Sequence, residues 1–306
     1  MGAPVLIAGQ GLAGTLLAWA CERAGREFVI YDAGHAEAAS RVGAGLVNPV
    51  TGERWVAAPG WAEKAAEARA ELAGLERAWG ARFVSDLRIR REWRSEEEGA
   101  RVRAKVERGE LSPWVEPAGL EAGAAWIEGA WRVDLPGLIA AGRTRWLGQG
   151  RLRERRLEPD EAAAWRGPVV WCTGAAETRV AGLRPVGGET LEIEAELPPG
   201  VVRHDGVWVL PVGPGRAWAG ASFVREEAER AARREELRAS VARQLAGVAW
   251  RETAVLAGRR MSTPDRTPRS GWLPGREGRE GVFNGLGSKG ALWAPGLARA
   301  WAERLT

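Results

Sequence analysis

The sequence contains few of the side chains that usually bind metal ions or take part in nucleophilic catalysis. It contains two cysteines, Cys21 and Cys172, and two histidines, His35 and His204. The cysteine spacing fits neither a metal site nor a disulfide framework, so we expect two buried thiols in a reducing compartment. So few histidines give poor support to a histidine zinc cluster or a Ser-His-Asp triad. We therefore predict no metal site.

Long apolar runs are also missing. No stretch approaches the length of a membrane span, and the first residues form a strand at once, without the features of a signal peptide. We therefore expect a cytoplasmic protein without membrane contact. With 306 residues, of which 45% are hydrophobic and 27% charged, the chain can form one large domain or two closely joined ones.

Lysine contributes little to the positive charge. Three lysines stand among 44 basic residues, and the formal net charge is +4. Arginines cluster at residues 88–94 and 151–156, a pattern that would suit an RNA-facing surface. Acidic residues are interspersed in both clusters, so we favour solvated faces of mixed charge.

The N-terminal segment carries a glycine motif between two apolar runs. Gly9, Gly11 and Gly14 follow the run at residues 4–8 and open a helical stretch, and Asp32 ends the run at residues 28–31. Strand, glycine turn, helix, strand and acid follow in the order of a dinucleotide site, with Asp32 accepting from the ribose. The helix N-terminus would bind the phosphates. The alternative is an ordinary β-α-β unit whose glycines serve packing only.

Elements of both kinds continue along the chain. The first helix is expected to bury one face and to end at Gly25; that face consists of Leu12, Leu16, Leu17, Ala20 and Ala24. Further helices are predicted at residues 61–80, 136–148, 225–246 and 291–304. Strand patterns occur at residues 169–175, 184–224 and 281–284, and short strands and loops at 83–135.

Five segments together resemble the D-amino-acid-oxidase-like family of FAD-dependent oxidoreductases, nearly end to end. They are residues 9–14 with Asp32, residues 40–49, residues 169–175, the Gly-x-Arg-x-x-Thr-x-Asp pattern at 258–265, and the loop at 284–290 with Ala294-Pro295-Gly296. The family includes glycine oxidase, sarcosine oxidase and the oxidase half of a tRNA wobble-uridine modification enzyme. Two departures are a trimmed inserted domain and the lack of a histidine at the expected position of a catalytic base.

The resemblance implies an α/β fold. It consists of a Rossmann-like FAD-binding domain with an inserted mixed or antiparallel β-sheet substrate domain. We assign residues 1–60, 136–182 and 255–306 to the FAD-binding domain. Residues 61–135 and 183–254 would form the substrate domain.

The resemblance also implies FAD as the cofactor, because the C-terminal loop favours FAD over NAD where the phosphate turn alone cannot. The expected cofactor contacts are Gly9, Gly11, Leu12, Ala13, Gly14, Asp32, Ser40, Arg41, Gly43, Ala44, Gly45, Leu46, Asn48, Thr173, Gly174, Gly285, Gly287, Ser288, Lys289 and Gly290. Lys289 and the following helix N-terminus would stabilise negative charge on the reduced flavin, unless this loop is a plain surface turn. Asn48 would bond to the ring or form an Asn-Pro turn.

Arg260 is the candidate anchor for a substrate carboxylate, because a guanidinium grips a carboxylate with two parallel hydrogen bonds. Arg259 competes for this role, and a structural salt bridge is the alternative for either residue. The predicted function is oxidation of the C–N bond of a small amino acid or secondary amine, by hydride transfer to flavin N5 and hydrolysis of the imine. One alternative is an oxidase of an aminoalkyl-modified tRNA uridine. Another is a non-catalytic FAD-binding subunit of a hetero-oligomer.

Overall fold

The computed structural model describes residues 3–34, 38–57 and 60–305. One sheet, called sheet A, contains β1 (Val5–Ala8), β2 (Phe28–Tyr31), β8 (Leu152–Arg153), β9 (Val169–Trp171), β15 (Arg269–Trp272) and β16 (Glu280–Asn284). Its order is β15-β16-β9-β1-β2-β8. Neighbouring strands run parallel, except that β15 runs antiparallel to β16. This is the parallel sheet expected of a Rossmann-like domain.

Both faces of sheet A are covered, as a parallel sheet requires. Val5 and Ile7 of β1 belong to one core, whereas Leu6 and Ala8 belong to another. The first core also takes residues from α1 (Leu12–Arg23), α3 (Trp61–Trp79), α5 (Leu135–Gly148) and α8 (Gly290–Arg304). The second core includes Ala162 of α6 (Pro159–Ala164). Within the described ranges, no helix is long and apolar enough to cross a membrane.

Helix α1 follows the predicted pattern at all but its last position. Leu12, Leu16, Leu17 and Ala20 are buried. Ala24 is exposed, because the helix ends at Arg23 and Ala24 forms the C-cap. Gly25 follows with a φ of +66°, the left-handed conformation that commonly ends a helix.

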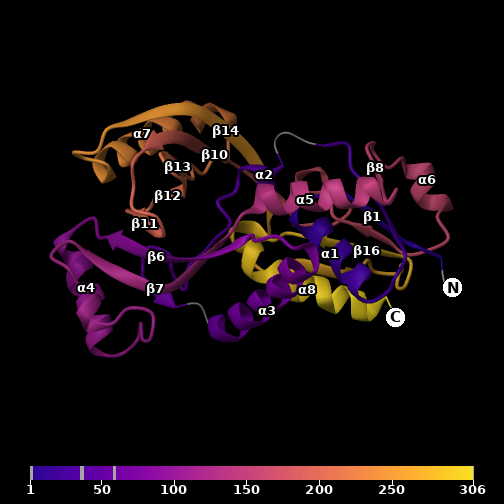
Figure 1. The fold of residues 1–306 in the computed structure, drawn as a ribbon, viewed down its shortest axis with the longest axis horizontal. Coiled ribbons are helices and arrows are strands. Elements are labelled where there is room, and N and C mark those ends of the chain that lie inside the picture. The colour runs from indigo at the N-terminus through magenta and orange to yellow at the C-terminus, as the bar shows by residue number, and fades with distance from the viewer. Residues whose placement is uncertain (1–2, 35–37, 58–59, 306) are drawn as a thin grey trace.

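The second sheet, called sheet B, is larger and mixed. It contains β3 (Leu46–Val47), β6 (Val84–Glu92), β7 (Ala124–Val133), β10 (Arg184–Ala195), β11 (Val201–His204), β12 (Trp208–Gly213), β13 (Arg216–Gly220) and β14 (Trp250–Ser262). Its order is β14-β10-β13-β12-β11-β6-β7-β3. Neighbours run antiparallel except β6 and β11. Figure 1 shows the two sheets in separate lobes, with the N- and C-termini marked in the lobe of sheet A. A small hairpin joins β4 (Val50–Thr51) to β5 (Val56–Ala57).

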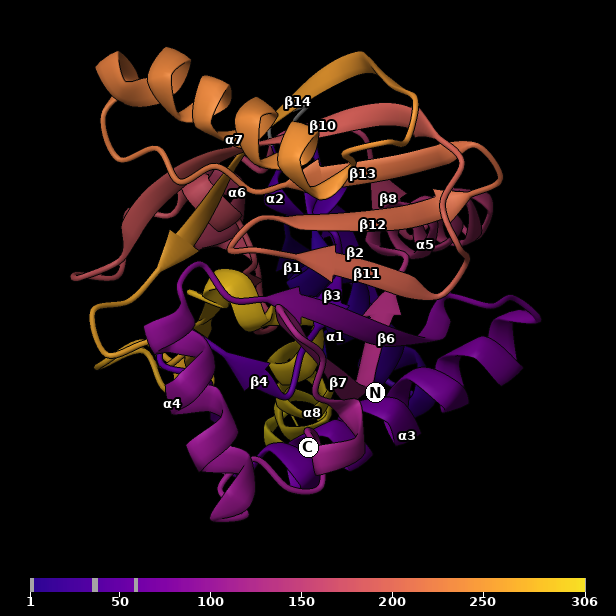
Figure 2. The ribbon, with the colours of Figure 1, turned by 90° about the vertical axis from the view of Figure 1, so that its left-hand side faces the viewer.

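Helix α7 (Arg230–Gln244) covers the outer face of sheet B. Leu237 and Val241 of α7 pack against Leu191, Ile193 and Ala219, and Figure 2 shows the helix lying across β10, β13 and β14. The other helices are α2 (Ala39–Val42) and α4 (Glu96–Glu107). The prediction of only strands and loops at 83–135 was wrong about α4. The Ser95 hydroxyl accepts a hydrogen bond from the Glu98 N–H, and this Ser-x-x-Glu pattern is the signal that could have revealed the helix.

The division of the chain into two domains stays a prediction, but the packing does not follow its boundaries everywhere. The short strand β3 lies in sheet B, although residues 1–60 were assigned to the FAD-binding domain, and two longer elements also depart from the division. Trp61, Ala65 and Leu72 of α3 lie in the core of sheet A, although residues 61–135 were assigned to the substrate domain. Strand β14 pairs along its length with β10 of sheet B, although residues 255–306 were assigned to the FAD-binding domain. Burial of the apolar face of α3 and the backbone pairing of β14 decide both placements.

Glu189 of β10 forms salt bridges with α7, and its substitution tests this packing. Its side chain is 1% exposed and accepts hydrogen bonds from Arg234 at 2.6 Å and Arg230 at 3.2 Å. The bonds from Arg234 come first among the causes that hold the pKa of Glu189 below its usual value. Such a carboxylate stabilises the fold above its unfolded pKa of about 4.3, and this stabilisation is lost as the pH falls through the lower folded pKa.

We expect Glu189→Gln to lower the free energy of unfolding by about 3 kcal/mol at pH 7, because two half-buried guanidinium groups lose the buried carboxylate that pairs with both of them. The difference from the wild type should shrink as the pH falls below about 4. Urea unfolding at both pH values measures it. Glu235→Gln is the matched control, since Glu235 is 68% exposed and also pairs with an arginine of α7. Equal effects of the two substitutions would contradict this account.

Candidate functional site

The N-terminal glycine turn (residues 9–14) lies where β1, β9 and α1 meet. Gly9 has a φ of +100°, and a Cβ there would lie 2.6 Å from the carbonyl oxygen of Cys172. A Cβ on Gly14 would collide with the carbonyl oxygen of Gly9, so only glycine lets α1 start this close to β1. Gly11 lies beside α2, because its Cβ would be 3.1 Å from the Ser40 hydroxyl.

The N-terminus of α1 is free to bind an anion. Its N-cap is Gly11, no side chain caps it, and its first turn holds no acidic residue. The first N–H groups of a helix have no partner within the helix, and the helix dipole adds positive potential there. Leu12 and Ala13 open the helix at this position. A phosphate is the anion that this geometry favours.

Asp32 ends β2 beside the glycine turn, but it already has partners. Its Oδ2 accepts the Gln10 N–H at 2.8 Å, and its Oδ1 accepts the Gly34 N–H at 2.9 Å. Arg143 of α5 donates to the same Oδ1 at 3.0 Å. Arg143 was not among the predicted contacts, since no local pattern connects it with Asp32.

Residues 40–49 cross between the two sheets. Ser40 and Arg41 lie in α2, whose Val42 carbonyl accepts a hydrogen bond from Thr190 of sheet B at 3.1 Å. A Cβ on Gly43 would lie 2.9 Å from the Ala39 carbonyl oxygen, and one on Gly45 would collide with the Val133 carbonyl oxygen. These glycines are therefore required by the protein's own packing, whatever lies beside them.

Strand pairing and side-chain hydrogen bonds hold the remaining residues of this segment. Ala44 is buried, and its carbonyl accepts a hydrogen bond from Arg132 at 3.2 Å. Leu46 pairs with Arg132 in sheet B. The Asn48 side chain accepts the Val50 N–H at 2.9 Å, which is the turn alternative for this residue.

The C-terminal loop (residues 284–290) returns to the first helix. A Cβ on Gly290 would lie 3.2 Å from Leu12 Cδ2, so the two glycine segments at opposite ends of the chain meet. Asn284 is buried; its Nδ2 donates to the Gly174 carbonyl at 3.0 Å and its Oδ1 accepts the Gly285 N–H at 2.7 Å. This side chain, absent from the predicted contacts, ties the loop to the turn after β9.

Two more contacts complete the edge of the site. Thr173 donates its hydroxyl hydrogen to Glu177 at 2.6 Å, which fixes the turn that contains Gly174. A Cβ on Gly285 would lie 3.0 Å from Thr263 Cγ2, and one on Gly287 would lie 3.9 Å from the Ser262 hydroxyl. The C-terminal loop therefore borders the end of β14. Ser288 and Lys289 are exposed, just before α8 begins without a side-chain cap.

Arg260 and Arg259 point to opposite faces of sheet B, because side chains alternate along a strand. Arg259 is opposite Gly187, on the face where Glu189 bonds to α7, whereas Arg260 is opposite Val186. Val186 shares a face with Thr190, whose hydroxyl reaches Val42. Arg260 thus faces the side of residues 40–49, and Arg259 the outer side.

Arg260 is half-buried, and burial lowers the pKa of its guanidinium. Among the residues that the structure describes, no carboxylate forms an ion pair with it; its guanidinium lies 4.8 Å from the ring centre of Phe223. Phe223 is 54% exposed. A partly desolvated cation beside an accessible aromatic ring can bind a small anion that carries an apolar group.

The cysteines and histidines were not among the predicted site residues. Cys21 and Cys172 are buried free thiols, as predicted, and burial raises the pKa of Cys21 to about 12. His204, in β11, accepts the Gly206 N–H, and burial lowers its pKa to about 3. His35 lies outside the described residues. No group of metal-binding side chains occurs in the described part of the chain.

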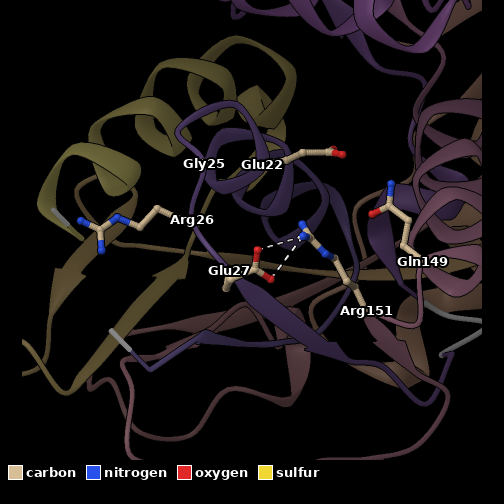
Figure 3. Close-up of a pocket in the computed structure, with 6 residues that line it drawn as sticks. All are labelled: Glu22, Gly25, Arg26, Glu27, Gln149 and Arg151. Carbon is tan, nitrogen blue, oxygen red and sulfur yellow. Dashed lines mark hydrogen bonds and ion pairs between the residues drawn. The ribbon is translucent and has the colours of Figure 1, made fainter. Parts of the chain in front are cut away.

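A surface pocket lies at the amino ends of strands β2 and β8 of sheet A, opposite the carboxyl ends that border the glycine turn. Figure 3 shows it lined by Glu22, Gly25, Arg26, Glu27, Gln149 and Arg151, with Glu27 paired to Arg151. These residues precede β2 and β8 or end α1, whereas the glycine turn follows β1. Ligands of open α/β sheets bind at the carboxyl ends of the strands, so we do not assign this pocket to the site.

Residues 4–304 match the model of the DAO family, described as FAD dependent oxidoreductase. The chain belongs to this family. It is therefore an enzyme of the FAD-dependent oxidoreductase class, as the resemblance implied. A comparison with curated protein sequences finds no match.

Solved structures share the fold. Glycine oxidase from Geobacillus kaustophilus has 21% identity and a TM-score of 0.76, covering 99% of this chain and 94% of that one. Iminodiacetate oxidase from Chelativorans sp. BNC1 has 21% identity and a TM-score of 0.72, with 97% and 94% covered. L-proline dehydrogenase from P. horikoshii has 15% identity and a TM-score of 0.69, with 100% and 93% covered. The α/β fold with an inserted mixed sheet is thus confirmed.

The residues at this edge fit the family's cofactor. Gly9 and Gly14 leave no room for a Cβ, the N-terminus of α1 has no side-chain cap, and Asp32 supplies carboxylate oxygens. These are the donors and acceptors that a pyrophosphate and a ribose need.

The close contact at Gly14 yields a test. We expect Gly14→Ala to lower the free energy of unfolding by about 3 kcal/mol and to reduce the flavin content strongly, since α1 must move away from the turn. Gly74→Ala in α3 is the control. Nothing lies within 4 Å of its Cβ position, so it should keep the flavin and gain about 0.5–1 kcal/mol. Absorbance at flavin wavelengths and thermal unfolding measure both; full flavin content in Gly14→Ala would refute this role.

Proposed function

We propose that the protein binds FAD and oxidises the C–N bond of a small amino acid or secondary amine. The observation that carries this proposal is Arg260, a half-buried guanidinium without a carboxylate partner in the described chain, on the face of sheet B that borders the C-terminal loop. Structural salt bridges occupy many other arginines, but the described residues form none with Arg260. An unpaired, partly desolvated cation is unfavourable unless a ligand completes it.

Arg260 would hold the substrate carboxylate by two parallel hydrogen bonds. Phe223, against the guanidinium, would then contact the apolar part of the substrate. Fixing both ends of a small molecule orients its Cα–H, and positioning of this kind supplies much of the rate of an enzymatic reaction. When bound, FAD supplies the hydride acceptor at N5, and water hydrolyses the resulting imine.

The cofactor would be held from both ends of the chain. The N-terminus of α1 and the glycine turn would bind the pyrophosphate, and Asp32 the ribose. The C-terminal loop and the uncapped N-terminus of α8 would place N–H groups and positive potential beside the ring. Lys289, exposed and adjacent, would add charge there.

Exchanging the two neighbouring arginines for alanine tests the anchor. We expect Arg260→Ala to lower kcat/KM for an amino acid about 100-fold, through loss of a charge-assisted bidentate contact. Arg259→Ala should keep kcat/KM within about twofold of the wild-type value, because Arg259 lies on the outer face of sheet B. Anaerobic bleaching of the flavin by an amine panel, with peroxide release in air, provides the measurement. An amine without a carboxylate should react equally with wild type and Arg260→Ala; an equal loss for both substrates would refute carboxylate binding.

A second candidate is an oxidase of an aminoalkyl-modified RNA base, favoured by exposed cations around the site. Arg184, Arg225 and Arg259 are exposed, although the charge of Arg259 also acts on the nearby Glu227 carboxylate, whose pKa is lowered first by its hydrogen bond to Arg230. The clusters at residues 88–94 and 151–156 are less suited, because Arg88, Arg90, Arg151 and Arg155 pair with carboxylates. Glu226 is also exposed nearby and would oppose a polyanion.

Salt dependence separates this candidate from the first. If RNA is the partner, tRNA should bind at low salt, and replacing Arg184, Arg225 and Arg259 by alanine should lower the log–log salt slope by about 2 to 3. The control replaces three arginines around α4: Arg101 and Arg108, which are exposed, and Arg103, which is half-buried. Absence of tRNA binding at low salt would remove the candidate. The third option, a non-catalytic FAD-binding subunit, was based on a trimmed inserted domain. Because the matched region covers 94% of the glycine oxidase chain, this basis is weak.

A further inference from the structure

Arg143 of α5 connects three elements at the carboxyl end of sheet A. Its Nη1 donates to Asp32 Oδ1 at 3.0 Å and to Gln10 Oε1 at 3.3 Å. Its Nη2 donates to Glu154 Oε1 at 2.8 Å. The side chains of Arg143 and Asp32 are 19% and 12% exposed, and that of Glu154 is 59% exposed. The guanidinium therefore bridges the end of β2 to the segment that follows β8.

The remaining donors of Arg143 are available to a ligand. A guanidinium has five N–H donors, and the three bonds above use two on Nη1 and one on Nη2. The Nε–H and the second Nη2–H have no hydrogen-bond partner among the described residues. Asp32 Oδ2 accepts one bond, from the Gln10 N–H, and a carboxylate oxygen can accept two. The cluster thus presents both donors and an acceptor.

The neighbouring arginine shows what a purely structural pair on this helix looks like. Arg145 donates through Nε and Nη2 to Glu22 of α1, at 3.1 and 2.8 Å. That pair joins two helices near the C-terminal end of α1, far along the helix from the glycine turn. Arg143 instead binds the carboxylate that ends β2, beside the uncapped N-terminus of α1.

We propose that Arg143 is a positioning residue for the adenosine half of the dinucleotide. By neutralising Asp32 and fixing its Oδ1, it leaves the second acceptor position of Oδ2, beside the bond from the Gln10 N–H, for a ribose hydroxyl, and its spare N–H groups can donate to the ribose oxygens. This inference rests on the proposed binding of FAD. It adds a contact that comes from a helix more than a hundred residues beyond the glycine turn.

The test is a double-mutant cycle for FAD binding. Apoprotein is titrated with FAD, and quenching of flavin fluorescence gives the Kd of wild type, Arg143→Ala, Asp32→Ala and the double variant. We expect Arg143→Ala to raise the Kd about tenfold, the size of one hydrogen bond to a charged group. In the Asp32→Ala background the same change should raise it less than about threefold, because Arg143 acts largely through Asp32.

Two further variants are controls that distinguish a loss of FAD binding from a general loss of structure. Arg145→Ala removes a structural pair of the same helix and should lower the melting temperature as much as Arg143→Ala does, with an unchanged Kd for FAD. Arg143→Lys keeps the charge but not the fork of donors, and should give an intermediate Kd. An unchanged Kd in Arg143→Ala, or full additivity with Asp32→Ala, would overturn the inference. Failure of wild-type apoprotein to bind FAD would instead overturn the proposed function.

Discussion

The close approach of backbone to backbone at the glycine turn is the constraint on which the rest of the site depends. Gly9 lies against the Cys172 carbonyl, and Gly14 against Gly9 itself, so neither position has room for a Cβ. This contact sets where α1 begins relative to β1 and β9. It thereby aims the free N–H groups of the helix at the space beside Asp32 and α2. A shift of α1 would separate these groups from one another.

The second requirement is that distant parts of the chain close around that space. Gly290 reaches Leu12, and Asn284 bonds to Gly174. Thr190 of sheet B bonds to Val42 between the sheets, and the end of β14 borders the C-terminal loop. Because each junction is a short-range contact between different lobes or chain ends, the geometry of the site requires both sheets to be folded and docked.

Charge is distributed unevenly around this framework. Many arginines form salt bridges that join two elements. Examples are Arg230 and Arg234 with Glu189, and Arg145 with Glu22. Arg260 departs from this pattern, because its guanidinium is partly desolvated and lacks a carboxylate partner in the described chain. A buried charge is costly without a partner. The substrate carboxylate of the proposed function would supply that partner.

Local order along the chain determined what the sequence could predict. The spacing of apolar residues placed α1, α3, α5 and α8, and the glycine turn between two strands predicted a dinucleotide site, because such signals act within a few residues. The pairing of β14 with sheet B, the packing of α3 under sheet A, and the bond from Arg143 to Asp32 were settled only in three dimensions. Each joins residues far apart in the sequence, where no local pattern records which side chains will meet.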